Sequence, residues 1–272
     1  PLLVGVLIGG QIVKETSIFD VSLVLYIALA IFVVAFLVLL FVPIYDPQQT
    51  GSNVVYEHSP WSFRHFVLGA IGVFVYVGVE VGLPGTLFYY LTDVTEQGAH
   101  LMGNVSAIAG GVTATYWLLM LIGRFLGGMI AGKVSSKLML ASTTFVAALL
   151  IVGVLLVDNK TTCLMPVFTG TGFMQAQIPL VAVFVMLCGL CTSVMWASIF
   201  NLATEGLGKY TAKASGIFMM MVVGGGVLPL LQSQVADHIG YISSYIIPLC
   251  GMLYLLFYAL LGSKRVSKGI PV

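Results

Sequence analysis

The stretch PIYDPQQTGSNVVYEHSP, from Pro43 to Pro60, decides how the chain is organised. It is polar, contains three prolines and separates one long apolar run from six others. The runs are Val21–Val42 before it and Phe63–Leu91, Met102–Ala131, Leu138–Val157, Ile178–Ala203, Ala214–Ala236 and Ile242–Gly262 after it. A helix of ~20 apolar residues crosses ~30 Å of hydrocarbon. The sequence therefore predicts an all-α polytopic membrane protein, with six spanning helices that follow a polar linker.

The composition supports this prediction and excludes several classes of function. Only 8% of the residues are charged, 59% are apolar, and the mean hydropathy is +1.08. A soluble enzyme, a nucleic-acid binder or a secreted module would need a polar surface that this chain lacks. The Cys188-x-x-Cys191 pair lies inside an apolar run without polar support, which favours plain packing. We therefore expect a lipid-embedded chain with no catalytic site, metal, cofactor or nucleic-acid partner.

The basic residues indicate the orientation in the membrane. Alternate loops and the neighbouring Arg124 hold nine of the eleven basic residues, and the other loops hold only Lys14 and Lys160. Lys and Arg favour the cytoplasmic side. The sequence therefore predicts a cell-membrane protein with a cytoplasmic C-terminus. The loop 158–177 would then lie outside and pack over the mouth of the helix bundle.

The arrangement around the linker predicts a transporter built from two six-helix halves. Residues 1–13 are apolar but too short to span, so they are interpreted as the end of a truncated fifth helix. The remaining predicted segments are helix 6 at 14–42, the cytoplasmic linker at 43–61, a C-terminal six-helix bundle at 62–264 and a cytoplasmic tail at 265–272. The missing N-terminal bundle of the same polypeptide would be the main structural partner.

The motif Gly-Arg-Phe-Leu-Gly-Gly begins at Gly123 and lies near the end of its predicted helix. Gly123 with Gly127, and Gly128 with Gly132, have the small-xxx-small spacing that lets another helix approach closely. Arg124 lies about two turns inside the helix, where a charge is costly unless it is paired or reaches the interface. Arg124 is thus either an anchor at the membrane interface or part of a gate. In the gate, Glu205 is the expected ion-pair partner of Arg124.

Glu80 is the only acidic residue deep inside a span, ~24 Å of helix beyond Arg64. Tyr76 lies one turn away on the same face. Gly78, Gly82, Pro84 and Gly85 are expected to interrupt this helix, and broken helices at the membrane midplane often hold substrate. We favour a polar-ligand site at Glu80 over the alternative of a structural carboxylate in a helix contact.

A second polar face carries Ser193, Trp196 and Asn201. Trp is unusual in the middle of a span, and its ring can stack on the C–H face of a sugar. The alternative is that Trp196 fills the bundle core. The following helix carries Gly224–Gly226 and Gln232, which indicates either a bend or very close packing.

We therefore predict that Glu80, Trp196, Asn201 and Gln232 face one central cavity. Tyr76 and Ser193 are expected to line the edge of this cavity.

Three stretches, Tyr76–Leu91, Gly123–Lys133 and Ser193–Gly240, together resemble the fucose–galactose–glucose:H⁺ symporter family of the major facilitator superfamily. The resemblance implies a two-bundle, alternating-access transporter for hexoses or 6-deoxyhexoses, with Glu80 and Trp196 in the central cavity. Trp196 stands where the family commonly has Phe or Tyr, and Ala197 where it often has Pro. Pro84-Gly85 also differs from the family's usual serine and aromatic residues.

The resemblance leaves the coupling ion and two other functions open. It places the proton-carrying carboxylates in the N-terminal half, so H⁺ is expected and Na⁺ stays possible. A seven-helix membrane receptor and a non-transporting sugar sensor are the alternatives to a transporter.

Overall fold

The computed structural model describes residues 22–42, 58–158, 160–168 and 172–264. The predicted end of helix 5 at 1–13, the first part of the segment 14–42, most of the linker and all of the tail 265–272 lie outside these residues. The division of the chain into these domains stays a prediction.

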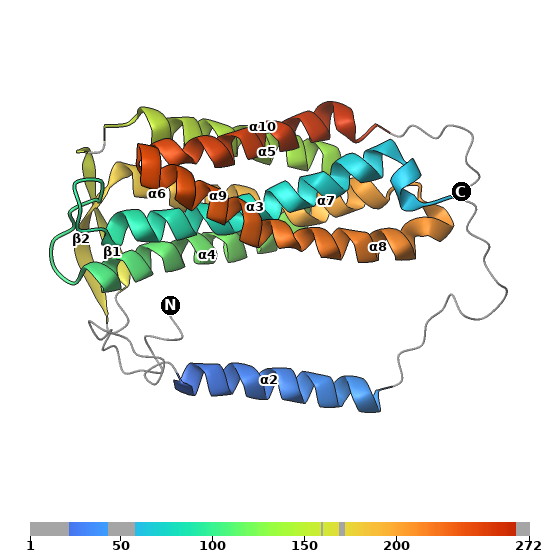
Figure 1. Cartoon of the computed structure of the whole chain (residues 1–272), viewed down its shortest axis with the longest axis horizontal. Coiled ribbons are helices and arrows are strands. Elements are labelled where there is room, and N and C mark those ends of the chain that lie inside the picture. Colours follow the sequence, from blue (N-terminus) through green and yellow to red (C-terminus); the bar gives the residue numbers. More distant parts are fainter. Residues whose placement is uncertain (1–21, 43–57, 159, 169–171, 265–272) are drawn as a thin grey trace.

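Six helical spans form one bundle in Figure 1. They are α3 (Arg64–Thr92), α4 (Val105–Ile130), α5 (Ser136–Leu156), α6 with α7 (Leu180–Thr192 and Met195–Thr204), α8 with α9 (Thr211–Met220 and Gly224–Ile239), and α10 (Ile246–Phe257) with its π-helical end Tyr258–Gly262. Short 3₁₀ turns occur at Pro60–Ser62, Gly208–Tyr210, Met221–Val223 and Ser243–Tyr245. The fold class is confirmed, and the six runs after the linker correspond in order to the six spans.

Polar caps and glycine mark several of the helix ends. The side chain of Asn104 accepts a hydrogen bond from Ala107 N before α4, and that of Ser135 accepts one from Leu138 N before α5. These caps pair main-chain N–H groups that have no partner inside the helix. Helix α9 ends at Ile239 and is followed by Gly240, whose φ of 91° disfavours residues with a side chain.

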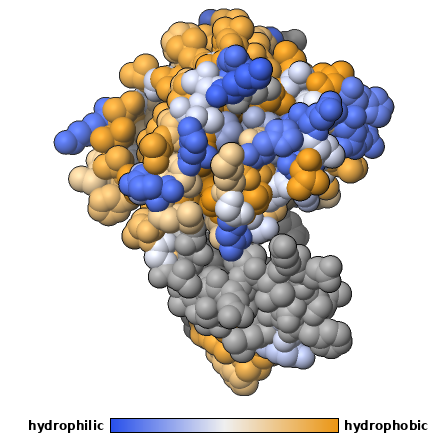
Figure 2. All heavy atoms as spheres, turned by 90° about the vertical axis from the view of Figure 1, so that its left-hand side faces the viewer, coloured by the Kyte–Doolittle hydropathy of each residue, from blue (hydrophilic) through white to orange (hydrophobic). Residues whose placement is uncertain are grey.

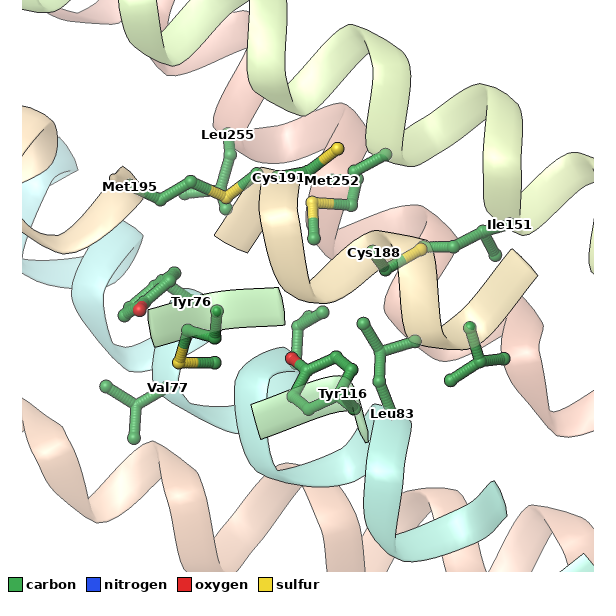
Figure 3. Packing of buried hydrophobic residues seen from close by; sticks show 14 of the residues in the cluster. Tyr76, Val77, Leu83, Tyr116, Ile151, Cys188, Cys191, Met195, Met252 and Leu255 are labelled. Carbon is green, nitrogen blue, oxygen red and sulfur yellow. The ribbon is translucent and has the colours of Figure 1, made fainter. Parts of the chain in front are cut away.

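Helix α3 is the most buried of the six spans and runs through the middle of the bundle. Figure 3 shows its side chains Tyr76, Val77 and Leu83 among residues of α4, α5, α6, α7 and α10. Cys188 and Cys191 of α6 are buried, free thiols in this cluster. Packing therefore accounts for the Cys-x-x-Cys pair.

Three tyrosines join α10 and its flanking turns to α3. Tyr245 donates to the carbonyl oxygen of Leu83 at 3.2 Å, Tyr254 to that of Leu68 at 2.8 Å, and Tyr258 to that of His65 at 3.3 Å. Hydrogen bonds between helices are favourable in a membrane because few other partners are available there. We call this contact the tyrosine seam.

Glycines allow close helix crossings at two of the predicted places. A Cβ at Gly224 would collide with the carbonyl of Phe74, so α9 and α3 meet backbone to backbone. Gly123 and Gly127 likewise pack against Ser193 and Val194 at the α6–α7 junction. The second predicted pair behaves differently, because a Cβ at Gly128 or Gly132 would meet nothing within 4 Å among the described residues.

A β-hairpin covers one end of the bundle, where hydropathy predicts only a loop. Its antiparallel strands β1 (Thr162–Phe168) and β2 (Phe173–Pro179) pair Thr162 with Pro179. Val167 is fully buried and packs at Gly111 of α4. Figure 2 views this hairpin end, where hydrophilic side chains gather among surrounding hydrophobic ones.

Helix α2 (Ser22–Phe41) lies apart from the bundle in Figure 1. It is apolar on all sides, and large side chains such as Tyr26, Phe32 and Phe41 are 67–82% exposed. A helix that is apolar all round is stable against lipid or another apolar surface rather than in water.

Candidate functional site

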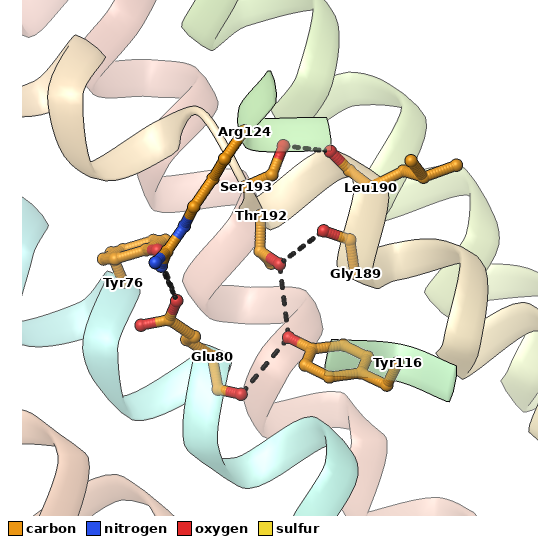
Figure 4. A network of polar contacts seen from close by, with 8 residues as sticks. All are labelled: Tyr76, Glu80, Tyr116, Arg124, Gly189, Leu190, Thr192 and Ser193. Carbon is orange, nitrogen blue, oxygen red and sulfur yellow. Dashed lines mark hydrogen bonds and ion pairs between the residues drawn. The ribbon is translucent and has the colours of Figure 1, made fainter. Parts of the chain in front are cut away.

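An ion pair in the middle of the bundle joins Glu80 of α3 to Arg124 of α4 (Figure 4). Arg124 donates to Glu80 Oε1 at 3.1 Å, and the hydroxyl of Tyr76 donates to the same oxygen at 2.7 Å. The Glu80 side chain is only 13% exposed, whereas that of Arg124 is 55% exposed. Among the described residues, no hydrogen bond reaches the second carboxylate oxygen, Oε2.

This pair corrects the predicted contact between Arg124 and Glu205. Helix α4 packs against α3 and α6, and its arginine reaches towards α3. Glu205 follows the end of α7, where its main-chain oxygen lies 3.0 Å from His65 Nε2. The long Arg side chain spans the height difference that sequence position alone suggests between Arg124 and Glu80.

A cavity of about 500 Å³ lies beside the ion pair. It is lined by residues of α4, α5 and the α6–α7 junction, namely Arg124, Gly127, Gly128, Ala131, Met139, Ser193, Val194, Trp196 and Ala197. The half-buried Trp196 ring lies 6.2 Å from Tyr76 and 5.6 Å from Phe218, measured between ring centroids. Trp196 thus joins the cavity to the Tyr76–Glu80 face of α3.

The predicted residue cluster is only partly brought together. Asn201 is exposed near the far end of α7, and its Nδ2 donates to Ser136 Oγ at 3.4 Å. It lines a different cavity of about 450 Å³ together with Glu205. Gln232 is 1% exposed and packs between α9 and α3 at Gly82.

The helix that carries Glu80 also differs from expectation. We predicted an interruption at Gly78, Gly82, Pro84 and Gly85, but α3 is continuous from Arg64 to Thr92. Gly78 and Gly82 serve close packing instead, against Leu228 and Gln232 of α9.

Sequence reasoning missed two polar residues on the main-chain side of Glu80, Tyr116 and Thr192. The hydroxyl of Tyr116 in α4 donates to the main-chain oxygen of Glu80 at 3.2 Å and lies 3.2 Å from Thr192 Oγ1 of α6. One signal for Tyr116 was available, because Pro84 follows Glu80 by four residues and cannot supply the helix hydrogen bond.

A second polar region lies at the hairpin end. A cavity of about 760 Å³ there is lined by loop residues that include Glu96, His100, Asp158, Lys160 and Tyr241. The described residues contain no group of three or more His, Cys, Asp or Glu side chains that could hold a metal.

Comparison with known proteins identifies related transporters, although no protein-family profile matches the chain. A glucose/galactose transporter of Brucella abortus is 35% identical over 208 residues, which cover 76% of this chain and 45% of the relative. A putative glucose/galactose transporter of Helicobacter pylori is 30% identical over 251 residues, or 88% and 54% of the two chains. The L-fucose-proton symporter of Escherichia coli is 25% identical over 206 residues, or 75% and 41%.

The chain is thus a homologue of glucose/galactose transporters and of an L-fucose-proton symporter, which is consistent with the fucose–galactose–glucose permease family. The crystal structure of FucP, a major facilitator superfamily transporter in the outward conformation, shares its fold with a TM-score of 0.65. That match has 19% identity and covers 89% of this chain and 54% of FucP. The chain thus spans about half the length of the curated relatives that it matches.

These homologues confirm the predicted resemblance and disfavour the seven-helix receptor. The relatives' names describe transporters rather than receptors or enzymes.

Proposed function

We propose that the complete protein transports a neutral hexose or 6-deoxyhexose, of the glucose, galactose or fucose type, across the cell membrane. The related proteins named glucose/galactose transporter and L-fucose-proton symporter support this substrate class. The proposed mechanism is alternating access driven by H⁺. In this proposal the C-terminus is cytoplasmic, as the distribution of basic residues indicates.

The observation that carries the proposal is the Glu80–Arg124 pair beside Trp196. Glu80 Oε2 is an available acceptor, and the half-exposed guanidinium of Arg124 retains N–H donors beyond the one bound to Glu80. Neighbouring sugar hydroxyls can donate to the first group and accept from the second. Because the two charges balance, the pair suits a neutral sugar better than an anionic one.

The other residues have supporting roles in this proposal. Trp196 stacks on the sugar ring, Ser193 lines the cavity, and Tyr76 holds the Glu80 carboxylate. Asn201 and Gln232 are left out of the proposed site because they lie elsewhere.

Gate movement is proposed at the crossing of α4 with the α6–α7 junction. There Gly123 and Gly127 pack against Ser193 and Val194, and Arg124 lines the same cavity as these two residues. A shift at this crossing would move Arg124 relative to Glu80, so the ion pair would change as the bundle rocks. An N-terminal six-helix bundle of the same polypeptide is the proposed partner that closes the cavity.

Uptake of labelled D-glucose, D-galactose and L-fucose by the complete protein in proteoliposomes tests the transport proposal. We expect uptake of at least one sugar to increase with an inward H⁺ gradient. If uptake increases only with a Na⁺ gradient, the coupling ion is Na⁺ rather than H⁺. Sugar binding without uptake would favour the sensor, and neither binding nor uptake would refute the proposal.

Tryptophan fluorescence tests the location of the site. The chain has three tryptophans, so in the double variant Trp61→Phe/Trp117→Phe of the complete protein the emission that is lost on a further Trp196→Phe change belongs to Trp196. Hexose should change its emission in a saturable way. An unchanged signal in a variant that still binds hexose would place the sugar away from Trp196.

A further inference from the structure

Pro84 removes a main-chain hydrogen bond at the residue that carries the site. In an α-helix the carbonyl of residue i accepts from the N–H of residue i+4, and proline has no N–H. The carbonyl of Glu80 therefore lacks its i+4 helix donor, although α3 continues through this position. An unpaired carbonyl inside a membrane is unfavourable because water is unavailable there.

Tyr116 supplies a donor at this carbonyl. Its hydroxyl oxygen lies 3.2 Å from Glu80 O, and its side chain is fully buried. On the other side, Thr192 Oγ1 lies 3.2 Å from the Tyr116 hydroxyl and also 3.2 Å from Gly189 O. Figure 4 shows this chain of contacts from α3 through α4 to α6.

Glu80 is thus held by α4 at two separate points. Tyr116 bonds its main chain, and Arg124, about two turns further along the same face of α4, bonds its carboxylate. Rotation or a rise of α3 at Glu80 would disturb both contacts together. The position of the carboxylate therefore depends on the main-chain contact.

We propose that Tyr116 is a positioning residue for the sugar site. Its hydroxyl replaces the hydrogen bond that Pro84 removes, and so fixes the height and rotation of Glu80 relative to Arg124. The effect on sugar rests on the proposed function, whereas the link between Tyr116 and Pro84 does not. Simple packing of the Tyr116 ring would give no dependence on residue 84.

A double-mutant cycle separates these explanations. In Pro84→Ala the new N–H of residue 84 can bond Glu80 O, so the Tyr116 hydroxyl becomes dispensable. We expect Tyr116→Phe to weaken hexose binding about tenfold when Pro84 is present, which corresponds to ~1.4 kcal/mol. In the Pro84→Ala background the loss should be below about threefold, or ~0.7 kcal/mol. Melting temperature should follow the same pattern.

Tyr245→Phe is the matched control. Tyr245 is also fully buried and donates to an α3 carbonyl, that of Leu83, at 3.2 Å. Leu83 has a non-proline residue, Leu87, four positions later, so its carbonyl keeps a helix donor. Pro84→Ala should therefore not rescue Tyr245→Phe.

Two outcomes would overturn the proposal. One is an equal loss from Tyr116→Phe in both backgrounds, and the other is an equal loss from Tyr116→Phe and Tyr245→Phe when Pro84 is present. The second comparison remains decisive if Pro84→Ala does not fold. If the wild type binds no hexose, the proposed function fails, and the melting temperatures alone still test the link between Tyr116 and Pro84.

Discussion

The two sides of α3 use polar side chains in opposite ways. On the side of α10, each of the three hydroxyl groups of the tyrosine seam donates a hydrogen bond to a main-chain oxygen of α3. On the side of α4, Glu80 keeps one carboxylate oxygen without a described partner, and Arg124 is half exposed. Unused hydrogen-bonding capacity lowers stability in a membrane. The contrast indicates that the seam holds the bundle together and that the α4 side is available for a ligand.

The largest expected effect is loss of sugar binding on the α4 side. Glu80→Gln removes a charged acceptor and leaves Arg124 without its counter-charge. Loss of a charge-assisted hydrogen bond costs about 1.5–3 kcal/mol, so we expect hexose affinity to fall roughly 10- to 150-fold in a titration of the complete protein. Tyr254→Phe in the seam should leave the affinity within about twofold. Equal affinities of wild type and Glu80→Gln would return Glu80 to a purely structural role.

Adding a methyl group at a glycine should lower the stability of the protein on the seam side of α3 but not on the α4 side. A Cβ at Gly69, near the seam, would lie 2.5 Å from Ala203 Cβ and 2.6 Å from the Tyr258 hydroxyl. Overpacking of this kind costs about 1–3 kcal/mol, so Gly69→Ala should lower the melting temperature. Gly128→Ala is the control, because its Cβ would meet nothing within 4 Å. If both variants melt alike, the two sides do not differ in packing.

Removal of single tyrosine hydroxyl groups should have smaller effects, and it compares the two sides by both stability and sugar affinity. Tyr258→Phe in the seam should cost about 0.5–1.5 kcal/mol of unfolding free energy without changing sugar affinity. Tyr76→Phe removes the bond to Glu80 Oε1 and should alter sugar affinity as well. Parallel denaturation and titration would measure both quantities. A change of affinity in Tyr258→Phe would contradict the separation of roles.

The smallest effect concerns the hairpin end of α3, beyond both sides. The main-chain N–H and the hydroxyl of Thr95 donate to Asp93 at 2.8 Å each, and these bonds lower the pKa of Asp93. Because the folded pKa lies below the unfolded one, this stabilisation is present above the unfolded pKa. It is lost as the pH falls through the folded pKa.

Asp93→Asn should therefore flatten the acid side of the stability–pH curve. Thr95→Ala should flatten it less, because the main-chain donor remains. An unchanged curve for Asp93→Asn would show that these bonds contribute nothing to stability.

The spans were predictable from the sequence, whereas the side-chain partners were not. The run Phe63–Leu91 corresponds to α3 because helix length in a membrane depends on consecutive apolar residues. The hairpin was missed because Thr- and Gly-containing segments such as 158–177 also suit loops. Glu80, Tyr76 and Trp196, which the structure brings together, could be singled out because polar and aromatic groups in mid-span are unusual. Their role in sugar binding stays a prediction.

The sequence by itself thus determined the number and order of the spans after the linker, the position of Glu80 in the interior of its span and the close crossing at Gly123 and Gly127. Only the tertiary structure decided that Arg124 pairs with Glu80 rather than Glu205, that Asn201 and Gln232 lie elsewhere, and that Tyr116 bonds the carbonyl left by Pro84. The physical reason is that the length and position of each span depend on consecutive apolar residues, which are visible in the sequence. Contacts between helices depend on the rotation and height of each helix against its neighbours, which are set by packing.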